Sequence, residues 1–106
     1  MKERCAKCAR TPDQAKLTKH HILPRRFFGS PPTAPIAVLC RGCHDQIEEM
    51  IPAKDVRAPQ FYWAVLFLFL ESDRILVYEW ATTRRYYVSL RSVPATPQQR
   101  LASVHG

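Results

Sequence analysis

The sequence predicts one small α+β domain, with short strands and two helices packed around a cross-linked core. Its 106 residues are enough for a single domain. A chain of this length buries a modest core, so a cross-link would help it to fold. The cysteines are the obvious candidates, because all four lie in two CxxC pairs, Cys5–Cys8 and Cys40–Cys43. Segments typical of strands and of helices alternate around and after these pairs.

The two cysteine pairs predict a structural zinc site. The chain starts with Met1-Lys2-Glu3-Arg4, which lacks the apolar segment of a secretory leader. We therefore expect a cytoplasmic protein, whose thiols stay reduced and bind metal. Disulfide bonds, or thiols with no shared role, are the alternatives. Two CxxC pairs separated by 31 residues suit a closed tetrahedral Zn²⁺ site, whose binding energy would contribute to folding.

The positive charge is concentrated in the first part of the chain. The formal net charge is +7, and residues 1–43 carry nine Lys or Arg against two acids. Residues 44–106 carry seven of each and are balanced. A basic lobe of this kind attracts a polyanion, most often a nucleic acid, although plain solubility is the other explanation.

The first predicted elements are short. Residues 17–23 are typical of a strand that ends at Pro24, and residues 36–39 of a second strand. Between them, residues 24–35 are predicted to form a loop, because prolines at this density neither donate to a sheet nor continue a helix. The second strand leads directly into the Cys40–Cys43 pair.

A helix is predicted from about Gly42 or Cys43 to Ile51, with Pro52 as its stop. Four residues recur at i, i+3, i+4 and i+7, which makes one stripe along a helix: His44, Ile47, Glu48 and Ile51. Asp45 is expected in the first turn, where the helix dipole favours a negative charge.

Beyond a connector at residues 53–59, residues 61–70 are ten consecutive apolar residues. Their leucines and the preceding proline favour a helix, whereas their aromatic and β-branched residues favour a strand; we predict a helix. It would reach only about 15 Å, half the thickness of a bilayer core, so we expect core packing, with a dimer interface as the alternative. Residues 75–80 and 85–90 predict a β-hairpin.

We therefore divide the chain into three parts. Residues 1–52 form the core with the cysteine pairs, and residues 53–91 form an extension of helix and hairpin that packs on it. Residues 92–106 contain two prolines, two glutamines and a final glycine, and we expect a flexible tail.

Three of the four histidines lie close to the cysteine pairs: His20 and His21 on the first predicted strand, and His44 at the start of the helix. Neighbours in a strand point to opposite faces, so His20 and His21 suit two different roles. One would be a metal ligand and the other a base. His20 and His44 could hold a second metal ion, and His21 could take a proton from water, because imidazole titrates near neutral pH.

Together, Cys5-x-x-Cys8, His20-His21-Ile22-Leu23-Pro24 and Leu39-Cys40-x-x-Cys43-His44 resemble the HNH endonucleases, which have a ββα-metal fold with paired zinc knuckles. The resemblance covers roughly residues 5–52, and the paired histidines are similar to those of the colicin DNases. It implies that His20 and His44 hold a divalent ion and that His21 is the general base. It also makes Glu48, one helical turn beyond His44, a further candidate ligand. A solvated surface acid is the alternative reading of Glu48.

The sequence departs from the family pattern at one position. The motif asparagine lies nine residues before the final histidine, where this chain has Pro35, and the sequence contains no asparagine. In the family that asparagine braces the loop and helps to orient the base. The alternative function is therefore a zinc-stabilised module that binds nucleic acid without cutting it.

The resemblance implies metal-dependent hydrolysis of phosphodiester bonds in double-stranded DNA. Arg25, Arg26 and Arg41 are the predicted phosphate contacts. Imidazole ligands suit transition ions, whereas Mg²⁺ prefers oxygen, so Mg²⁺, Mn²⁺, Ni²⁺ and Zn²⁺ all remain candidates for the catalytic ion. We expect no membrane association, and either a homodimer or a place in a larger phage or bacterial complex is compatible with the sequence.

Overall fold

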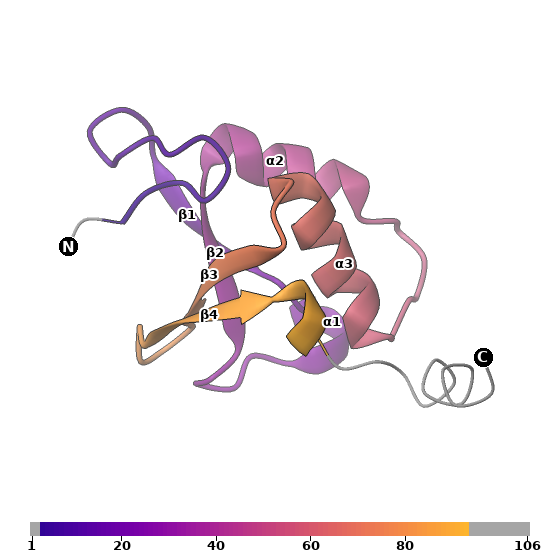
Figure 1. The fold of residues 1–106 in the computed structure, drawn as a ribbon. Coiled ribbons are helices and arrows are strands. Elements are labelled where there is room, and N and C mark those ends of the chain that lie inside the picture. Colours follow the sequence, from indigo (N-terminus) through magenta and orange to yellow (C-terminus); the bar gives the residue numbers. More distant parts are fainter. Residues whose placement is uncertain (1–2, 94–106) are drawn as a thin grey trace.

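The computed structural model describes residues 3–93 (Figure 1). Its strands form one antiparallel sheet in the order β1-β2-β3-β4. The strands are β1 (Leu17–His21), β2 (Pro35–Cys40), β3 (Arg74–Glu79) and β4 (Arg85–Ser89). The helices are α1 (Arg25–Phe28), α2 (Arg41–Met50) and α3 (Pro59–Leu70), followed by a 3₁₀ turn at Leu90–Ser92. The predicted α+β class is confirmed.

The β1–β2 hairpin and α2 form a continuous unit. In the antiparallel register Leu17 faces Cys40 and His21 faces Ile36. Helix α2 begins directly after β2, so Cys43 and His44 lie in its first turn and a half. Its buried side is anchored by Ile47, which is fully inaccessible. The helix begins one or two residues earlier than predicted, so Asp45 lies beyond the first turn, where it pairs with Arg41.

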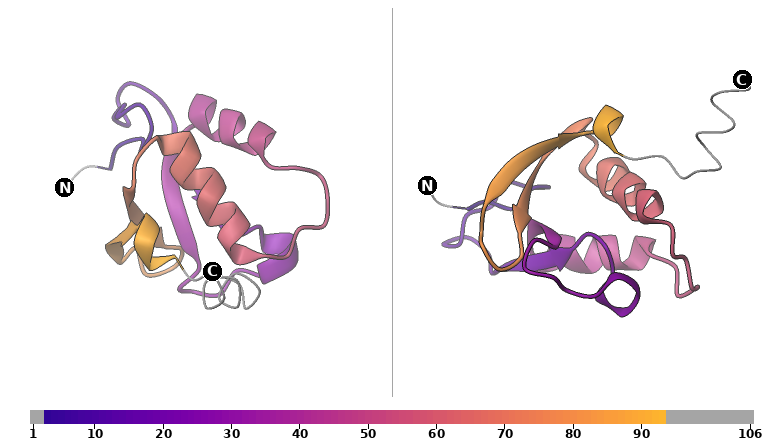
Figure 2. Two further views of the ribbon diagram at one scale, coloured as in Figure 1. Left: turned by 45° about the vertical axis from the view of Figure 1, so that its right-hand side comes forward. Right: turned by 90° about the horizontal axis from the view of Figure 1, so that it is seen from below.

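Helices α2 and α3 cover the same side of the sheet (Figures 1 and 2), with α2 against β1 and β2 and α3 against β3. The predicted helix over residues 61–70 is confirmed, and it begins with Pro59 in its first turn, where a missing N–H costs nothing. Tyr62, Val65, Leu66 and Phe69 follow the i, i+3, i+4, i+7 pattern and are all buried. Among residues 3–93, no helix is long and apolar enough to cross a membrane.

The predicted hairpin is also confirmed, as β3 and β4, and β3 pairs with β2 where Ile36 faces Tyr78.

The predicted loop at residues 24–35 is wrong in its first part, which forms α1. Its turn is stabilised by N–H groups of Phe27 and Phe28 that donate to the carbonyl of Pro24, and it ends at Gly29 with a φ of 72°. Pro31, Pro32 and Pro35, which favour a loop, all lie after this turn. Residues 94–106 of the predicted tail lie outside the described residues.

Candidate metal centres and active site

The four cysteines meet beside the start of α2. Cys5 and Cys8 come from the N-terminal loop, Cys40 ends β2 and Cys43 lies in α2. Their sulfur atoms all lie within 4.8 Å of one another, and none is in a disulfide. The sulfurs of Cys8 and Cys40 are 3.7 Å apart, whereas a tetrahedron with Zn–S bonds of about 2.3 Å has edges of about 3.8 Å. The cluster therefore fits a Zn²⁺ ion.

The surroundings of these thiols favour one thiolate even without a cation. Burial opposes ionisation of Cys5, but backbone N–H groups of Cys8, Cys40 and Lys7 are directed at its sulfur and hold its pKa at about 6. Burial and the neighbouring thiols raise the pKa of Cys43. A bound cation would stabilise all four thiolates, so metal binding here is coupled to proton release and to folding.

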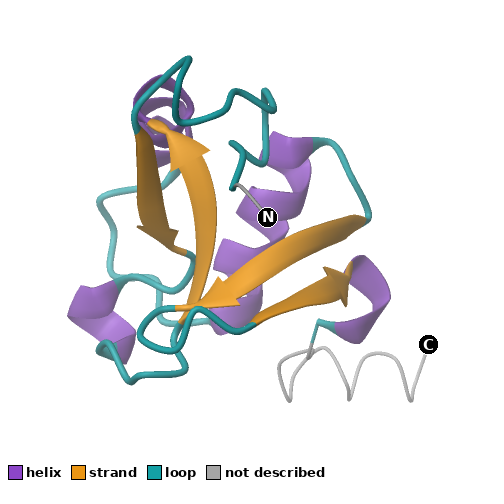
Figure 3. Ribbon diagram, turned by 90° about the vertical axis from the view of Figure 1, so that its left-hand side faces the viewer, coloured by secondary structure: helices purple, strands orange, loops and turns teal. Residues whose placement is uncertain are grey.

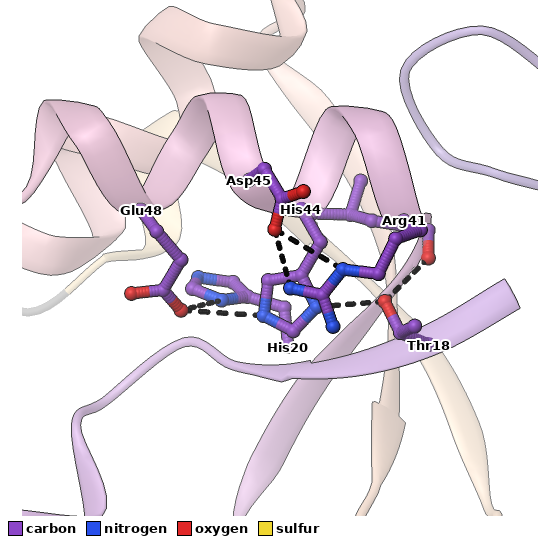
Figure 4. A network of polar contacts seen from close by, with 7 residues as sticks. Thr18, His20, Arg41, His44, Asp45 and Glu48 are labelled. Carbon is purple, nitrogen blue, oxygen red and sulfur yellow. Dashed lines mark hydrogen bonds and ion pairs between the residues drawn. The ribbon is translucent and has the colours of Figure 1, made fainter.

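A second cluster joins His20 on β1 to His44 and Glu48 on α2 (Figure 4). Glu48 Oε1 lies 3.2 Å from Nε2 of His44 and 3.4 Å from Nδ1 of His20. Ligand bonds of about 2.1 Å place neighbouring donor atoms about 3.0 to 3.4 Å apart in octahedral or tetrahedral geometry. Glu48 therefore lies where a metal ligand would lie, which favours the ligand role over that of a solvated surface acid.

The buried ring of His20 suits a metal ligand. Only 3% of His20 is exposed, and its Nδ1 atom has no hydrogen-bond partner among residues 3–93. The Glu48 carboxylate lies within ion-pair distance of this atom but outside hydrogen-bond geometry. A buried polar atom without a partner costs about 1–3 kcal/mol. A metal ion between the two residues would take the lone pair of this nitrogen.

Thr18 determines which nitrogen of His44 faces this cluster. The Thr18 hydroxyl donates its single proton to the carbonyl of Leu39 at 2.7 Å, and its oxygen is also 2.7 Å from Nδ1 of His44. The hydroxyl must therefore accept the second hydrogen bond, and Nδ1 of His44 carries the proton. The lone pair of Nε2 then faces Glu48 Oε1. Two facing lone pairs repel each other unless a cation or a proton lies between them.

His21 points to the opposite side of β1. Its Nε2 is 3.0 Å from the hydroxyl oxygen of Ser30, and its ring packs on Trp80 with centroids 4.6 Å apart. Burial, and then the nearby charges of Arg25 and His20, lower the pKa of His21. Both effects favour the neutral imidazole.

The three histidines and Glu48 line a single pocket of about 290 Å³. It is lined by Lys19, His20, His21, Pro24, Arg25, Arg26, His44, Glu48 and Ile51. The predicted base, the predicted ligands and two of the predicted phosphate contacts thus share one hollow. Arg41 does not line it, because its guanidinium group is paired with Asp45 on the exposed side of α2.

Residues 5–59 match a family model described as HNH endonuclease. This match spans more than half of the chain. The protein belongs to the HNH endonuclease family. Membership indicates a nuclease-type or nucleic-acid-related function, and the comparisons with curated proteins and with solved structures found no match.

At the position of the HNH asparagine, Pro35 opens β2 and accepts a hydrogen bond from the N–H of Ile22 at 3.1 Å. The preceding loop is held by the β3–β4 turn, where the N–H of Trp80 donates to Ala34 at 2.9 Å and that of Ala81 donates to Pro32 at 3.0 Å. The loop is therefore braced by backbone groups from outside the stretch that matches the family.

Sequence reasoning missed three residues of the site: Thr18, Ser30 and Trp80. Thr18 could have been found, because it lies two residues before His20 and so on the same face of the strand. Ser30 and Trp80 carry no such signal, since the first lies in an irregular loop and the second is brought to His21 by a distant hairpin.

Proposed function

We propose that this protein is a metal-dependent endonuclease that hydrolyses phosphodiester bonds of DNA. The observation that carries the proposal is the shared pocket, in which a partly exposed histidine lies beside a cluster of two histidines and a carboxylate, with two arginines at the rim. Each part of a phosphodiester hydrolysis site is represented there.

His20, His44 and Glu48 would hold the divalent ion. When bound, the ion supplies positive charge that stabilises the phosphate oxygens and the leaving oxygen. Two imidazoles suit Mn²⁺, Ni²⁺ or Zn²⁺, and the Glu48 carboxylate adds the oxygen ligand that Mg²⁺ prefers. The cysteine cluster would hold Zn²⁺ in a closed, structural site, which fixes the N-terminal loop to the start of α2.

His21 would act as the general base. With its Nε2–H donated to Ser30, the Nδ1 atom is left to accept a proton from water, which then attacks phosphorus in line with the leaving 3′ oxygen. Trp80 covers one side of the ring and limits its rotation. The role of the missing asparagine, which is to orient the base, would thus fall to Ser30 and Trp80.

Arg25 and Arg26 would bind phosphates on either side of the scissile bond, since both are exposed at the pocket rim. Such contacts position the backbone without reading its sequence. Arg41 is exposed outside the pocket, and we propose it as a contact to a more distant phosphate. Double-stranded DNA is the substrate that the family resemblance implies.

A plasmid-nicking assay tests the proposal. Zinc-loaded wild-type and His21→Ala proteins are compared with Mg²⁺, Mn²⁺ or Ni²⁺ added, and DNA binding is followed by gel shift. We expect cleavage by the wild type alone, with both proteins shifting DNA. If neither protein cuts while both shift DNA, the protein is the non-cleaving binding module instead. If neither cuts nor shifts DNA, both functions are wrong.

A further inference from the structure

We propose that the side of the sheet facing away from α2 and α3, termed here the outer sheet face, is a second contact surface for the DNA backbone. It is formed by Lys19, Arg74, Arg85 and Tyr87. The inference rests on the proposed function, because the DNA bound there is the flank of the DNA cut at His21. Three of these four residues lie outside the stretch that matches the family.

The strand register connects this surface to the candidate base. His21 faces Ile36 on β2, Ile36 faces Tyr78 on β3, and Tyr78 faces Arg85 on β4. Directly opposed residues share a face of the sheet, so this row runs from the pocket to the far edge. Three strand spacings of about 4.8 Å place Arg85 about 14 Å from His21, or about four base pairs along a duplex.

The alternation of buried residues identifies the two faces. Ala37, Leu39, Ile75 and Val77 belong to the core, and Tyr86 and Val88 pack against it. Figure 3 shows the helices behind the sheet. On β3 and β4 the alternate positions Arg74, Leu76, Tyr78, Arg85 and Tyr87 therefore face away from the core. Lys19, His21, Ile36 and Val38 share this side of the sheet by register, but Ile36 and Val38 are buried, so the accessible part of the outer sheet face lies on β1, β3 and β4. No carboxylate is among these outward positions.

Aromatic rings support the charged groups on this face. The guanidinium carbon of Arg74 lies 4.3 Å from the ring centroid of Tyr87, which is 61% exposed, and Lys19 Nζ lies 5.2 Å from that of Trp80. Trp80 in turn packs on His21. Among residues 3–93, neither Lys19 nor Arg74 forms an ion pair with an acid. Cations held on rings, with no acid to neutralise them, suit the phosphates of a nucleic acid.

Salt-dependent DNA binding tests the surface. The zinc-loaded full chain with His21→Ala serves as the parent, so that the probe is not cut. Arg74→Gln and Arg85→Gln are each added to it, and Lys54→Gln is the matched control for loss of one charge. Lys54 is exposed in the α2–α3 connector, and Figure 1 shows this connector running away from the strands. Binding is measured by fluorescence anisotropy with a labelled duplex of about 25 base pairs, which extends well beyond the roughly four base pairs estimated between His21 and Arg85. The Kd is measured at salt concentrations from about 50 to 200 mM.

Each arginine variant is expected to lower the slope of log Kd against log salt by about 0.9, the value for one lost phosphate contact, while the lysine control keeps the parent slope. Melting temperatures verify that all variants remain folded. If the arginine variants keep the parent slope, the outer sheet face does not bind DNA and only this inference is overturned. If the parent itself fails to bind the duplex, the proposed function is overturned together with it.

Discussion

Replacing Thr18 with valine should weaken the candidate catalytic metal site without disturbing the fold. Valine has nearly the same shape and is well suited to a strand, but it removes the hydroxyl that accepts from Nδ1 of His44 and donates to Leu39. The half-buried Nδ1–H then loses its acceptor, which costs about 1–3 kcal/mol. The alternative tautomer avoids this cost but places the proton on Nε2, the atom that faces Glu48. Either response weakens cation binding.

The expected loss of metal affinity is 10- to 100-fold, the usual effect of removing a partner that orients a metal-bound histidine. This corresponds to about 1.4 to 2.8 kcal/mol, in agreement with the cost of an unpaired ring N–H. Isothermal titration with Mn²⁺, which does not displace Zn²⁺ from thiolates, measures it on zinc-loaded protein. Thr18→Ser, which retains the hydroxyl, should bind close to the wild-type value. Equal affinities for Thr18→Val and Thr18→Ser would refute the assigned tautomer.

Three further predictions concern the zinc cluster, the base and the core. Cys8→Ser, or chelation of zinc from the wild type, should abolish cooperative thermal unfolding, because the binding energy of a structural zinc site is part of the folding energy; an unchanged melting curve would contradict a zinc site. Ser30→Ala should lower kcat by roughly 10- to 100-fold with KM unchanged, since it loosens His21 without touching the phosphate contacts, and Ser30→Thr should restore the rate. Leu66→Ala should destabilise the protein by about 2–5 kcal/mol in urea unfolding, because Leu66 is completely buried between helix and sheet.

The sequence was most informative where local rules decide the structure. The spacing of the cysteine pairs predicted a cluster that the structure forms, and the stripe on α2 predicted that His44 and Glu48 share one side of a helix, since both follow from fixed helical and knuckle geometry. Helix α1 was missed because the three prolines downstream of it predicted a loop for the whole of residues 24–35, whereas the four residues after Pro24 form a helical turn. Trp80 could not be predicted at all: its contact with His21 depends on the pairing of β3 with β2, which local patterns do not specify.

The position of β1 at the edge of the sheet explains how two adjacent histidines can serve one site. Alternation along the strand sends His20 toward α2, where it is buried, and His21 toward the outer face, where it is partly exposed. In an interior strand the two faces would be separated by neighbouring strands. Because β1 has only one neighbour among the strands of residues 3–93, both side chains reach the pocket at its edge. A candidate ligand that must be dry and a candidate base that must reach water are thereby placed side by side by a single strand.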